Sequence, residues 1–384
     1  MQRNKKIVCL TNIPTPYRNN LYRVMSYVCE QNSYKFEVWF LDKTESGRYW
    51  KLQDMDFEYS YKFFRGIKFK YRDASFHFNP GVIVELLKAP PEVILVGGSW
   101  IYPTVILTGF ILKFNKNVRT IFWSESHLKS SVYLDKVSNK VRKRILNLFD
   151  EYAVPGVFSK EYVHHYVDNP IIHYFPNTVN YHIFSDKINK LKENNKIIRK
   201  KWNLSDNKKI FFISARLHPN KGLEPFFKAL KHVDANEQFV FLVAGDGYLR
   251  HRIFEVTKRM PFEIKLLGHR DESEMLELYA IADIFVLPSI IDPNPLSVIE
   301  AMWAKKPLLL SNRVGNHPET LTEGENGWLF DPEKPIDVKK AFLKALATTE
   351  QDLAKLGENS YLKAKQYFDT EVVVRNFLNE ILSL

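Results

Sequence analysis

The sequence predicts an α/β protein with two doubly wound, Rossmann-like domains that face a central cleft. Apolar segments of strand length alternate with helical patterns, and this series begins a second time after residue 208. Near-continuous apolar strands between helices are typical of parallel sheets that are covered on both faces. The length of 384 residues, of which 45% are hydrophobic, also exceeds the usual size of one domain.

The first domain is predicted to span residues 1–185. Its predicted strands are KIVCLT, FEVWFL, VILVGG, RTIFWS, EYAVPG and IIHYFP. The first helix follows PTPYRNN, because Leu21, Val24, Met25 and Val28 recur there at helical spacing.

One segment of this domain, Val93–Leu112, carries no charge over twenty residues and is long enough to span a bilayer. Gly97, Gly98 and Ser99 interrupt it, and Pro103 can begin a helix. We therefore favour a buried strand, a loop and a buried helix, with a membrane span as the alternative.

A polar, basic linker is predicted at residues 186–208, and the second domain at residues 209–360. The second domain's predicted strands are KIFFISAR, FVFLVAGDG, EIKLLGH, IFVLPS and PLLLSN, with helices such as Glu224–His232 and Ser273–Ala282 between them. Residues 361–384 are predicted as a C-terminal helix that packs back towards the first domain.

The two cysteines and the N-terminus favour a cytoplasmic protein. Cys9 lies in an apolar segment and Cys29 in a predicted helix, which fits reduced thiols better than a disulfide framework. The first apolar run lasts only about five residues, which is too short for the core of a signal peptide.

Charge is distributed unevenly along the chain. Residues 1–209 contain 34 Lys and Arg against 19 Asp and Glu, whereas residues 210–384 contain 21 against 25. The excess of positive charge in the first half indicates an anionic partner, which could be nucleic acid, an anionic bilayer surface or a phosphate-bearing substrate.

A basic amphipathic helix is predicted in the first half, within LDKVSNKVRKRILNLF. Its apolar residues recur at the spacing of one helix face: Leu134, Val137, Val141, Ile145 and Leu148. The helix could have a solvated outer face or contact an anionic membrane surface. No RNA-binding or helix-turn-helix signature accompanies it, so a nucleic-acid partner is not expected.

Two motifs of the second domain follow predicted strands. ISARLHPNKG places Arg216 and Lys221 at a strand-to-helix junction, with Gly222 for a close turn, and two cations near helix N–H groups suit a diphosphate. VAGDGYLR contributes Gly245 at a second strand end. The chain has no G-x-G-x-x-G motif, which argues against a nicotinamide-dependent oxidoreductase.

A third motif, VLPSIIDPNPLSVIEAM, carries two carboxylates. Asp292 lies in a loop after a strand, and Glu300 lies in the first turns of a helix that begins near Leu296 or Ser297. Because ligands of open parallel sheets bind beyond the carboxyl ends of the strands, Glu300 is expected to project towards the cleft beside the diphosphate site.

In this order and spacing, the motifs resemble those of the retaining glycosyltransferases of family four, which have the two-domain GT-B fold. RLHPNKG, DPNPLSVIEAM and GENGWLF carry the resemblance together, and PNTVNYHIF is similar to the family's hinge segment. The resemblance implies a hexosyltransferase that uses a nucleotide-sugar donor and no cofactor. It implies that Arg216 and Lys221 clamp the diphosphate, Asp292 holds the sugar and Glu300 holds the ribose.

These assignments have a physical basis. A nucleotide-sugar has a ribose diol, a diphosphate and sugar hydroxyls, so a binding site needs carboxylates at both ends and cations in the middle. Fixed cations stabilise the charge that grows on the leaving diphosphate, and no metal is required. The DMD segment, Asp54–Asp56, could be read as a metal-binding D-x-D motif, but its polar surroundings argue against a metal site.

The donor loop departs from the family pattern. Asp292 stands where the family usually has Glu, and Pro293 and Pro295 lack the N–H groups of the usual glycines. We expect the prolines to stiffen the loop. The remaining donor contacts are predicted at Asn294, whose side chain replaces lost backbone contacts, and at Leu296 and Ser297.

Candidate acceptor residues lie in the first domain. TNIPTPYRN resembles the P-x-P-Y-R loop of some polysaccharide-building members, which places Tyr17 and Arg18 at the cleft. Arg18 could meet a phosphate or be an ordinary helix-start arginine. In FWSESHLKSS, His127 occupies the place where resembling enzymes keep a histidine near the reacting sugar, and Glu125 is the alternative charged neighbour.

Three functions follow from these observations. The leading one is transfer of a sugar, with retention, to a lipid-linked or polysaccharide acceptor by a peripheral enzyme at the inner face of the cell membrane. A catalytically silent nucleotide-sugar-binding protein of the same fold is the second. A nucleic-acid-binding protein is the third.

Overall fold

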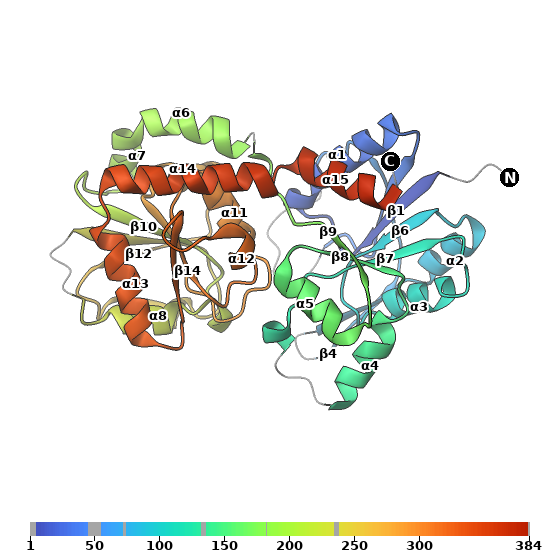
Figure 1. The fold of residues 1–384 in the computed structure, drawn as a ribbon. Coiled ribbons are helices and arrows are strands. Elements are labelled where there is room, and N and C mark those ends of the chain that lie inside the picture. The colour runs from blue at the N-terminus through green and yellow to red at the C-terminus, as the bar shows by residue number, and fades with distance from the viewer. Residues whose placement is uncertain are drawn as a thin grey trace. The chain divides into compact units, whose positions relative to one another are not determined.

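The computed structural model describes residues 5–44, 55–71, 74–131, 136–181, 183–233 and 238–382. It contains two compact units, each with its own parallel sheet (Figure 1). Unit 1 comprises Met1–Val179 and Thr370–Leu384, and unit 2 comprises Asn180–Asp369. The chain therefore leaves unit 1 after Val179 and returns to it for its last segment.

Unit 1 is built on a seven-stranded parallel sheet in the order β3-β2-β1-β6-β7-β8-β9. All six predicted strands are present, whereas β3 and a separate antiparallel hairpin, β4 and β5, were not predicted. Those three segments are partly exposed, so they lack the continuous apolar pattern of the other strands. The strands are β1 (Lys6–Thr11), β2 (Lys35–Phe40), β3 (Ser60–Phe63), β4 (Ile67–Tyr71), β5 (Ala74–Phe78), β6 (Val93–Val96), β7 (Arg119–Trp123), β8 (Glu151–Val154) and β9 (Ile171–Tyr174).

Helices cover both faces of this sheet. The apolar side chains of α1 and α15 pack on one face, where Phe377 of α15 stacks on Phe175 with ring centroids 4.1 Å apart. The apolar side chains of α2, α3, α4 and α5 pack on the other face. The helices are α1 (Pro16–Gln31), α2 (Pro80–Lys88), α3 (Pro103–Leu112), α4 (Lys136–Leu146), α5 (Val157–Tyr166) and α15 (Thr370–Leu382).

The uncharged segment Val93–Leu112 forms the buried strand β6, a loop and helix α3, as the sequence predicted. Helix α3 has only ten residues. None of the helices in the described parts of the chain combines the length and the apolar composition needed to cross a bilayer.

Helix α4 forms, but its predicted apolar face is wrong in part. Val137 and Val141 are exposed, while Ile145 is buried, and Leu134 lies outside the described residues. The basic residue Arg142 is buried instead: its guanidinium lies 4.8 Å from the ring centroid of Trp100 and within hydrogen-bonding distance of Tyr166. Cation–π contacts let an arginine replace an apolar residue on the inner face of a helix.

Unit 2 is built on a six-stranded parallel sheet in the order β12-β11-β10-β13-β14-β15. This is the order 3-2-1-4-5-6 of dinucleotide-binding folds. From β10 the chain adds strands towards one edge of the sheet, and from β13 it adds them towards the other edge, so the strand order reverses between β10 and β13. Five of the strands were predicted, whereas GWLF, expected in a loop, forms β15. The strands are β10 (Lys209–Ser214), β11 (Phe239–Ala244), β12 (Glu263–Gly268), β13 (Ile284–Leu287), β14 (Leu308–Ser311) and β15 (Gly327–Phe330).

The segment expected as a linker is largely helical and belongs to unit 2. A π-helical turn at Ile183–Lys187 leads into α6 and α7, and α6 and α7 both pack against α10. The helices of unit 2 are α6 (Ile188–Glu193), α7 (Asn195–Lys201), α8 (Leu223–Leu230), α9 (Arg250–Thr257), α10 (Glu272–Ile281), α11 (Leu296–Trp303), α12 (His317–Thr320), α13 (Pro335–Ala347) and α14 (Glu350–Tyr367), with a 3-10 turn at Pro219–Lys221.

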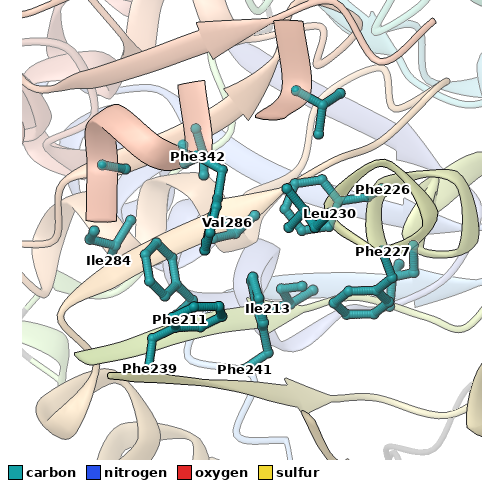
Figure 2. Packing of buried hydrophobic residues seen from close by; sticks show 14 of the residues in the cluster. Phe211, Ile213, Phe226, Phe227, Leu230, Phe239, Phe241, Ile284, Val286 and Phe342 are labelled. Atoms are coloured by element: carbon teal, nitrogen blue, oxygen red, sulfur yellow. The ribbon is translucent and has the colours of Figure 1, made fainter. Parts of the chain in front are cut away.

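An aromatic core fixes the strands on which the candidate site is built. Phe211 of β10 and Phe241 of β11 meet Phe342 of α13, and Phe226 of α8 packs against Phe241 (Figure 2). All four side chains are fully or almost fully buried. Close packing of this kind makes the interior rigid, so the carboxyl end of β10 has a defined position.

A charge cluster around the buried residues Glu151 and His173 ties α15 to the sheet of unit 1. Arg119 makes two hydrogen bonds to the carboxylate of Glu151, and Nε2 of His173 lies 2.6 Å from the same carboxylate. Nδ1 of His173 lies 3.0 Å from Glu380 of α15. Burial opposes charging of Glu151, but His173 and Arg119 lower its pKa to about 2. The hydrogen bond to Glu151 in turn raises the pKa of His173.

We predict that replacing His173 with Gln lowers the melting temperature by about 2–4 °C below about pH 6 and by less above about pH 8. Because the pKa of His173 is raised in the folded state, its contribution is complete below the ordinary value of 6.5 and is lost as the pH rises through the folded value. Thermal unfolding at both pH values measures this. His164 is exposed, so His164→Gln is the control; an equal loss for His173→Gln at both pH values would refute the charge cluster.

Candidate active site

Three charged residues predicted for the donor site of unit 2 follow strands β10 and β13, which are neighbours in the sheet. Arg216 and Lys221 follow β10, and Asp292 follows β13. The order of the strands reverses at this place, and in open parallel sheets such a reversal opens a crevice at the carboxyl ends of the strands. The sheet therefore brings residues separated by more than seventy positions to one ligand-binding edge.

Lys221 and Asp292 form an ion pair at this edge. Nζ of Lys221 donates to Oδ2 of Asp292, and Oγ of Ser289 donates to the same oxygen at 3.2 Å. Asp292 is only 7% exposed, and Ser289 is fully buried. A charge pair so far removed from water keeps its geometry because each partner alone would be costly to bury.

Backbone hydrogen bonds lock three strand-end loops together around this pair. The carbonyl of Asn220 accepts the N–H groups of Ile290 and Ile291 at 2.8 and 3.0 Å. The carbonyl of Asp292 accepts the N–H group of Gly315 at 2.7 Å. The loops that follow β10, β13 and β14 thus form one rigid wall.

Two glycines allow these loops to approach closely. Gly222 has φ +66°, and a Cβ atom there would collide with the carbonyl oxygen of Pro288. Gly245 has φ +137°, and a Cβ atom there would collide with the carbonyl oxygen of Ala215. Both positions therefore require glycine for conformation and for space.

The first turn of α11 adds hydrogen-bond donors to the edge. Pro295 precedes the helix and provides no side-chain cap, so the N–H groups at Leu296 and Ser297 have no capping side chain. Nδ2 of Asn294 is buried and has no hydrogen-bond partner within the described residues. Uncapped N–H groups at a helix N-terminus favour an anion, and the amide of Asn294 is available to a ligand.

Glu300 lies in the second turn of α11 and is held by Tyr279. The hydroxyl of Tyr279 donates to Oε2 of Glu300 at 2.7 Å. Removal of the Glu300 carboxylate from water raises its pKa, although the hydrogen bond from Tyr279 opposes the rise. The structure thus fixes this carboxylate in an environment that disfavours its charge.

Arg216 is the exposed cation of the edge. Within the described part of the chain, its side chain makes no ion pair or hydrogen bond, in contrast to Lys221. An exposed guanidinium beside strand β10 is available for a bidentate contact with a phosphate group.

A second ion pair joins the strand ends of unit 1. Arg18 donates to Oε1 of Glu125 at 2.5 Å and to Thr11 at 3.2 Å, and its guanidinium lies 4.3 Å from the ring centroid of Trp123. Asn177 donates to the same oxygen of Glu125 at 2.9 Å. Arg18 and Asn177 therefore hold Oε1 of Glu125 in place, and the carboxylate remains partly exposed.

The remaining predicted residues of unit 1 lie beside this pair in the chain. The ring of Tyr17 contacts the guanidinium of Arg18 at 5.7 Å. His127 is 2% exposed, and its ring centroid lies 6.2 Å from that of Phe158. His127 is thus a buried residue of the loop that follows β7.

Sequence reasoning missed the residues that hold the predicted ones. Tyr279 supports Glu300, Ser289 supports Asp292, and Asn177 supports Glu125. Ser289 and Asn177 each lie within a segment that was singled out, but Tyr279 lies on a different helix from Glu300, and no local pattern links the two. The described residues contain no group of three or more His, Cys, Asp or Glu side chains placed to hold a metal ion, and Asp54 of the DMD segment lies outside them.

Comparison with known families identifies this part of the chain. Residues 175–363 match the model described as "Glycosyl transferases group 1". The chain is therefore similar to glycosyl transferases group 1 over about half of its length. The matched residues include all of the predicted donor residues.

Two curated relatives align with part of this chain. It is 31% identical over 194 residues to the UDP-Gal:alpha-D-GlcNAc-diphosphoundecaprenol alpha-1,3-galactosyltransferase of Escherichia coli, with 49% of this chain and 47% of the relative covered. It is also 31% identical over 150 residues to an uncharacterized glycosyltransferase of Methanocaldococcus jannaschii, with 39% and 41% covered. The chain thus spans less than half the length of these relatives.

A solved structure matches the whole fold. Anabaena HepE in complex with UDP and glucose superimposes with a TM-score of 0.72 at 16% identity, covering 99% of this chain and 100% of that one. At this identity the likeness shows the fold alone. It confirms the predicted α/β class with two Rossmann-like sheets of the GT-B type.

We predict that Gly222→Ala destabilises the protein more than Gly324→Ala and also weakens nucleotide binding. Both glycines have positive φ, which costs an alanine about 1 kcal/mol. Only Gly222 adds a collision with Pro288, because the space around Gly324 is open. Thermal unfolding and nucleotide titration measure the difference; equal melting temperatures would contradict the packed β10 and β13 loops.

Proposed function

We propose that this protein is a retaining, metal-independent glycosyltransferase that moves a sugar from a nucleotide-sugar to an acceptor. The observation that carries the proposal is the Lys221–Asp292 ion pair at the reversal point of the unit 2 sheet. Arg216 and the first turn of α11 provide further positive potential at the same edge, and Glu300 provides a carboxylate on that helix.

In this proposal, Lys221 and Asp292 pair with each other before the nucleotide-sugar binds. Each of them then contacts the nucleotide-sugar instead. An ammonium group has three N–H donors, so Lys221 can turn from Asp292 to the oxygens of a diphosphate. The carboxylate of Asp292 is then free to accept a hydrogen bond from a sugar hydroxyl. Glu300, oriented by Tyr279, accepts hydrogen bonds from the ribose diol.

The chemistry follows from where negative charge develops. As the bond between the sugar and the diphosphate breaks, charge grows on the leaving diphosphate, and Arg216, Lys221 and the N-terminus of α11 stabilise it. Loop hydrogen bonds fix the backbone at Lys221, so the main rearrangement is the turn of the Lys221 side chain away from Asp292. His127 is proposed to contact the sugar or the acceptor hydroxyl, as the resemblance implies.

The acceptor is proposed to be a lipid-linked glycan or a growing polysaccharide, bound through unit 1. The Escherichia coli relative is named for a diphosphoundecaprenol acceptor, which supports this class. The fixed carboxylate of Glu125, with Arg18 and Tyr17, offers an acceptor hydroxyl a hydrogen-bond partner. The positive first half of the chain suits both a lipid diphosphate and an anionic membrane, so we place the enzyme at the inner face of the cell membrane.

A screen of nucleotide-sugars tests the proposal. Because a ligand that binds only the folded state raises the melting temperature, one class among UDP, GDP and ADP sugars is expected to stabilise the protein in the presence of a metal chelator. Release of the nucleotide on addition of acceptor then shows transfer, and the anomeric proton signals of the product report retention. Stabilisation without nucleotide release would instead support a catalytically silent binding protein, which the engaged Asp292 also permits.

We predict that donor affinity falls on acidification at a pH above the ordinary glutamate value of 4.5. The pKa of Glu300 is raised, so its carboxylate takes up a proton, and loses its acceptor capacity for ribose, earlier than an ordinary Glu. Titration of the responding nucleotide across the acidic range measures this. The variant Glu300→Gln is expected to bind about tenfold more weakly without that inflection; an inflection that persists in the variant would remove Glu300 from the site.

A further inference from the structure

Helix α3 and the turn after it expose bulky apolar side chains, although the helix also buries Val105 and Leu112. Phe110 of α3 is 55% exposed, Phe114 in the turn after α3 is 76% exposed, and Leu107 is also exposed. The opposite side of the helix, which is buried, includes Thr108 and Gly109. In an amphipathic helix of a globular protein, the bulky apolar side chains normally face the core. In α3 this arrangement is reversed for Leu107 and Phe110, although Val105 and Leu112 face the core.

The reversed orientation is fixed by contacts of the inner face. The hydroxyl of Thr104 donates to the carbonyl of His77 and accepts the N–H group of Asn79, at 2.9 and 2.8 Å. A Cβ atom at Gly109 would lie 3.0 Å from the ring of Phe149, so a larger residue would require that ring to shift by a few tenths of an ångström. A rotation of α3 that buried Phe110 would break these contacts.

Helix α2, which packs against α3, extends the apolar surface. Leu87 is 67% exposed, and Val84 is exposed beside it in the same helix. We name the set the α2–α3 surface, which consists of Val84, Leu87, Leu107, Phe110 and Phe114. Contiguous exposed apolar surfaces of this kind mark interaction sites in soluble proteins.

The charges around the α2–α3 surface are positive. Lys88 ends α2, and Lys113 and Lys116 follow α3, all three exposed. The sequence has no Asp or Glu from residue 93 to residue 118, and Glu85 of α2 is neutralised by Lys62 at 2.7 Å. An apolar surface with a cationic rim is complementary to acyl chains beneath anionic head groups.

We propose that the α2–α3 surface docks on an anionic lipid bilayer, with Phe110 and Phe114 among the acyl chains and the lysines at the head groups. The ten residues of α3 reach about 15 Å, half of the hydrocarbon thickness, so the helix lies in the interface and does not cross it. The proposal explains why the segment Val93–Leu112 is free of charge although it spans no membrane. It rests on the proposed function only in placing the enzyme beside a membrane-bound acceptor.

Vesicle flotation of the full chain tests the docking. The protein is expected to bind phosphatidylcholine vesicles that contain phosphatidylglycerol and not those of phosphatidylcholine alone. The double variant Phe110→Ser, Phe114→Ser should lose at least about tenfold in partitioning, because two exposed rings no longer enter the bilayer. The matched control is Phe254→Ser, Ile336→Ser, which removes two exposed apolar side chains from unit 2 and should bind as the unmodified protein does.

A site-specific probe shows which surface enters the lipid. Cys9 and Cys29 are buried and free, so an environment-sensitive fluorophore can be attached to a new cysteine in Leu107→Cys or, as the control, Ile336→Cys. Anionic vesicles are expected to shift the emission to shorter wavelength at residue 107 and leave it unchanged at residue 336.

The proposal would be overturned by equal binding of both double variants to anionic vesicles, by equal binding to neutral and anionic vesicles, or by no emission change at residue 107. Sedimentation of the unmodified protein and of Phe110→Ser, Phe114→Ser tests the alternative that a second copy of this chain covers the α2–α3 surface. A dimer that dissociates in this variant and does not bind vesicles would overturn it in favour of self-association. The nucleotide-induced melting shift is expected in both double variants, so loss of docking is distinguishable from failure of the proposed donor site.

Discussion

The ion pair between Lys221 and Asp292 is the interaction on which the proposed donor site depends. Its partners are 71 positions apart and meet only because β10 and β13 are neighbours where the sheet order reverses. Asp292 is almost completely removed from water, so its charge would be costly there without the charge of Lys221 beside it. In the proposed function, a diphosphate replaces Asp292 as the partner of Lys221, and donor binding thereby releases a carboxylate for the sugar.

Unit 1 uses a similar arrangement. Arg18 follows β1 and Glu125 follows β7, and their ion pair joins two strand ends as Lys221 and Asp292 do in unit 2. In each unit, a packed sheet positions oppositely charged side chains at the carboxyl edge, where parallel strands leave N–H groups and loops for a ligand. The aromatic core beneath β10 and β11 gives the unit 2 pair its rigid base.

The sequence was sufficient for features set by local pattern and insufficient for those set by tertiary contact. Buried strands such as β10 and β13 were predicted because parallel strands are apolar throughout. β3 and β15 were missed because one is partly exposed and the other is a four-residue strand inside a motif that looked like a loop. The spacing of the motif placed Asp292 and Glu300 around one loop, but it could not show that Tyr279 holds Glu300. Nor could the helical pattern show that Arg142 is buried where Val141 was expected. Both features depend on packing between helices.

The central claim, that Lys221 binds the diphosphate, is tested most directly by the affinity that the diphosphate adds to the nucleoside. Calorimetric titration measures the affinities for the responding nucleoside diphosphate and for its nucleoside. The ratio of the two is compared between the unmodified protein and Lys221→Met. We predict that the ratio falls by about tenfold or more in Lys221→Met, because a charged hydrogen-bond donor to phosphate is lost, and that it is unchanged in Lys228→Met, whose lysine pairs with Glu224. An unchanged ratio in Lys221→Met would contradict the account.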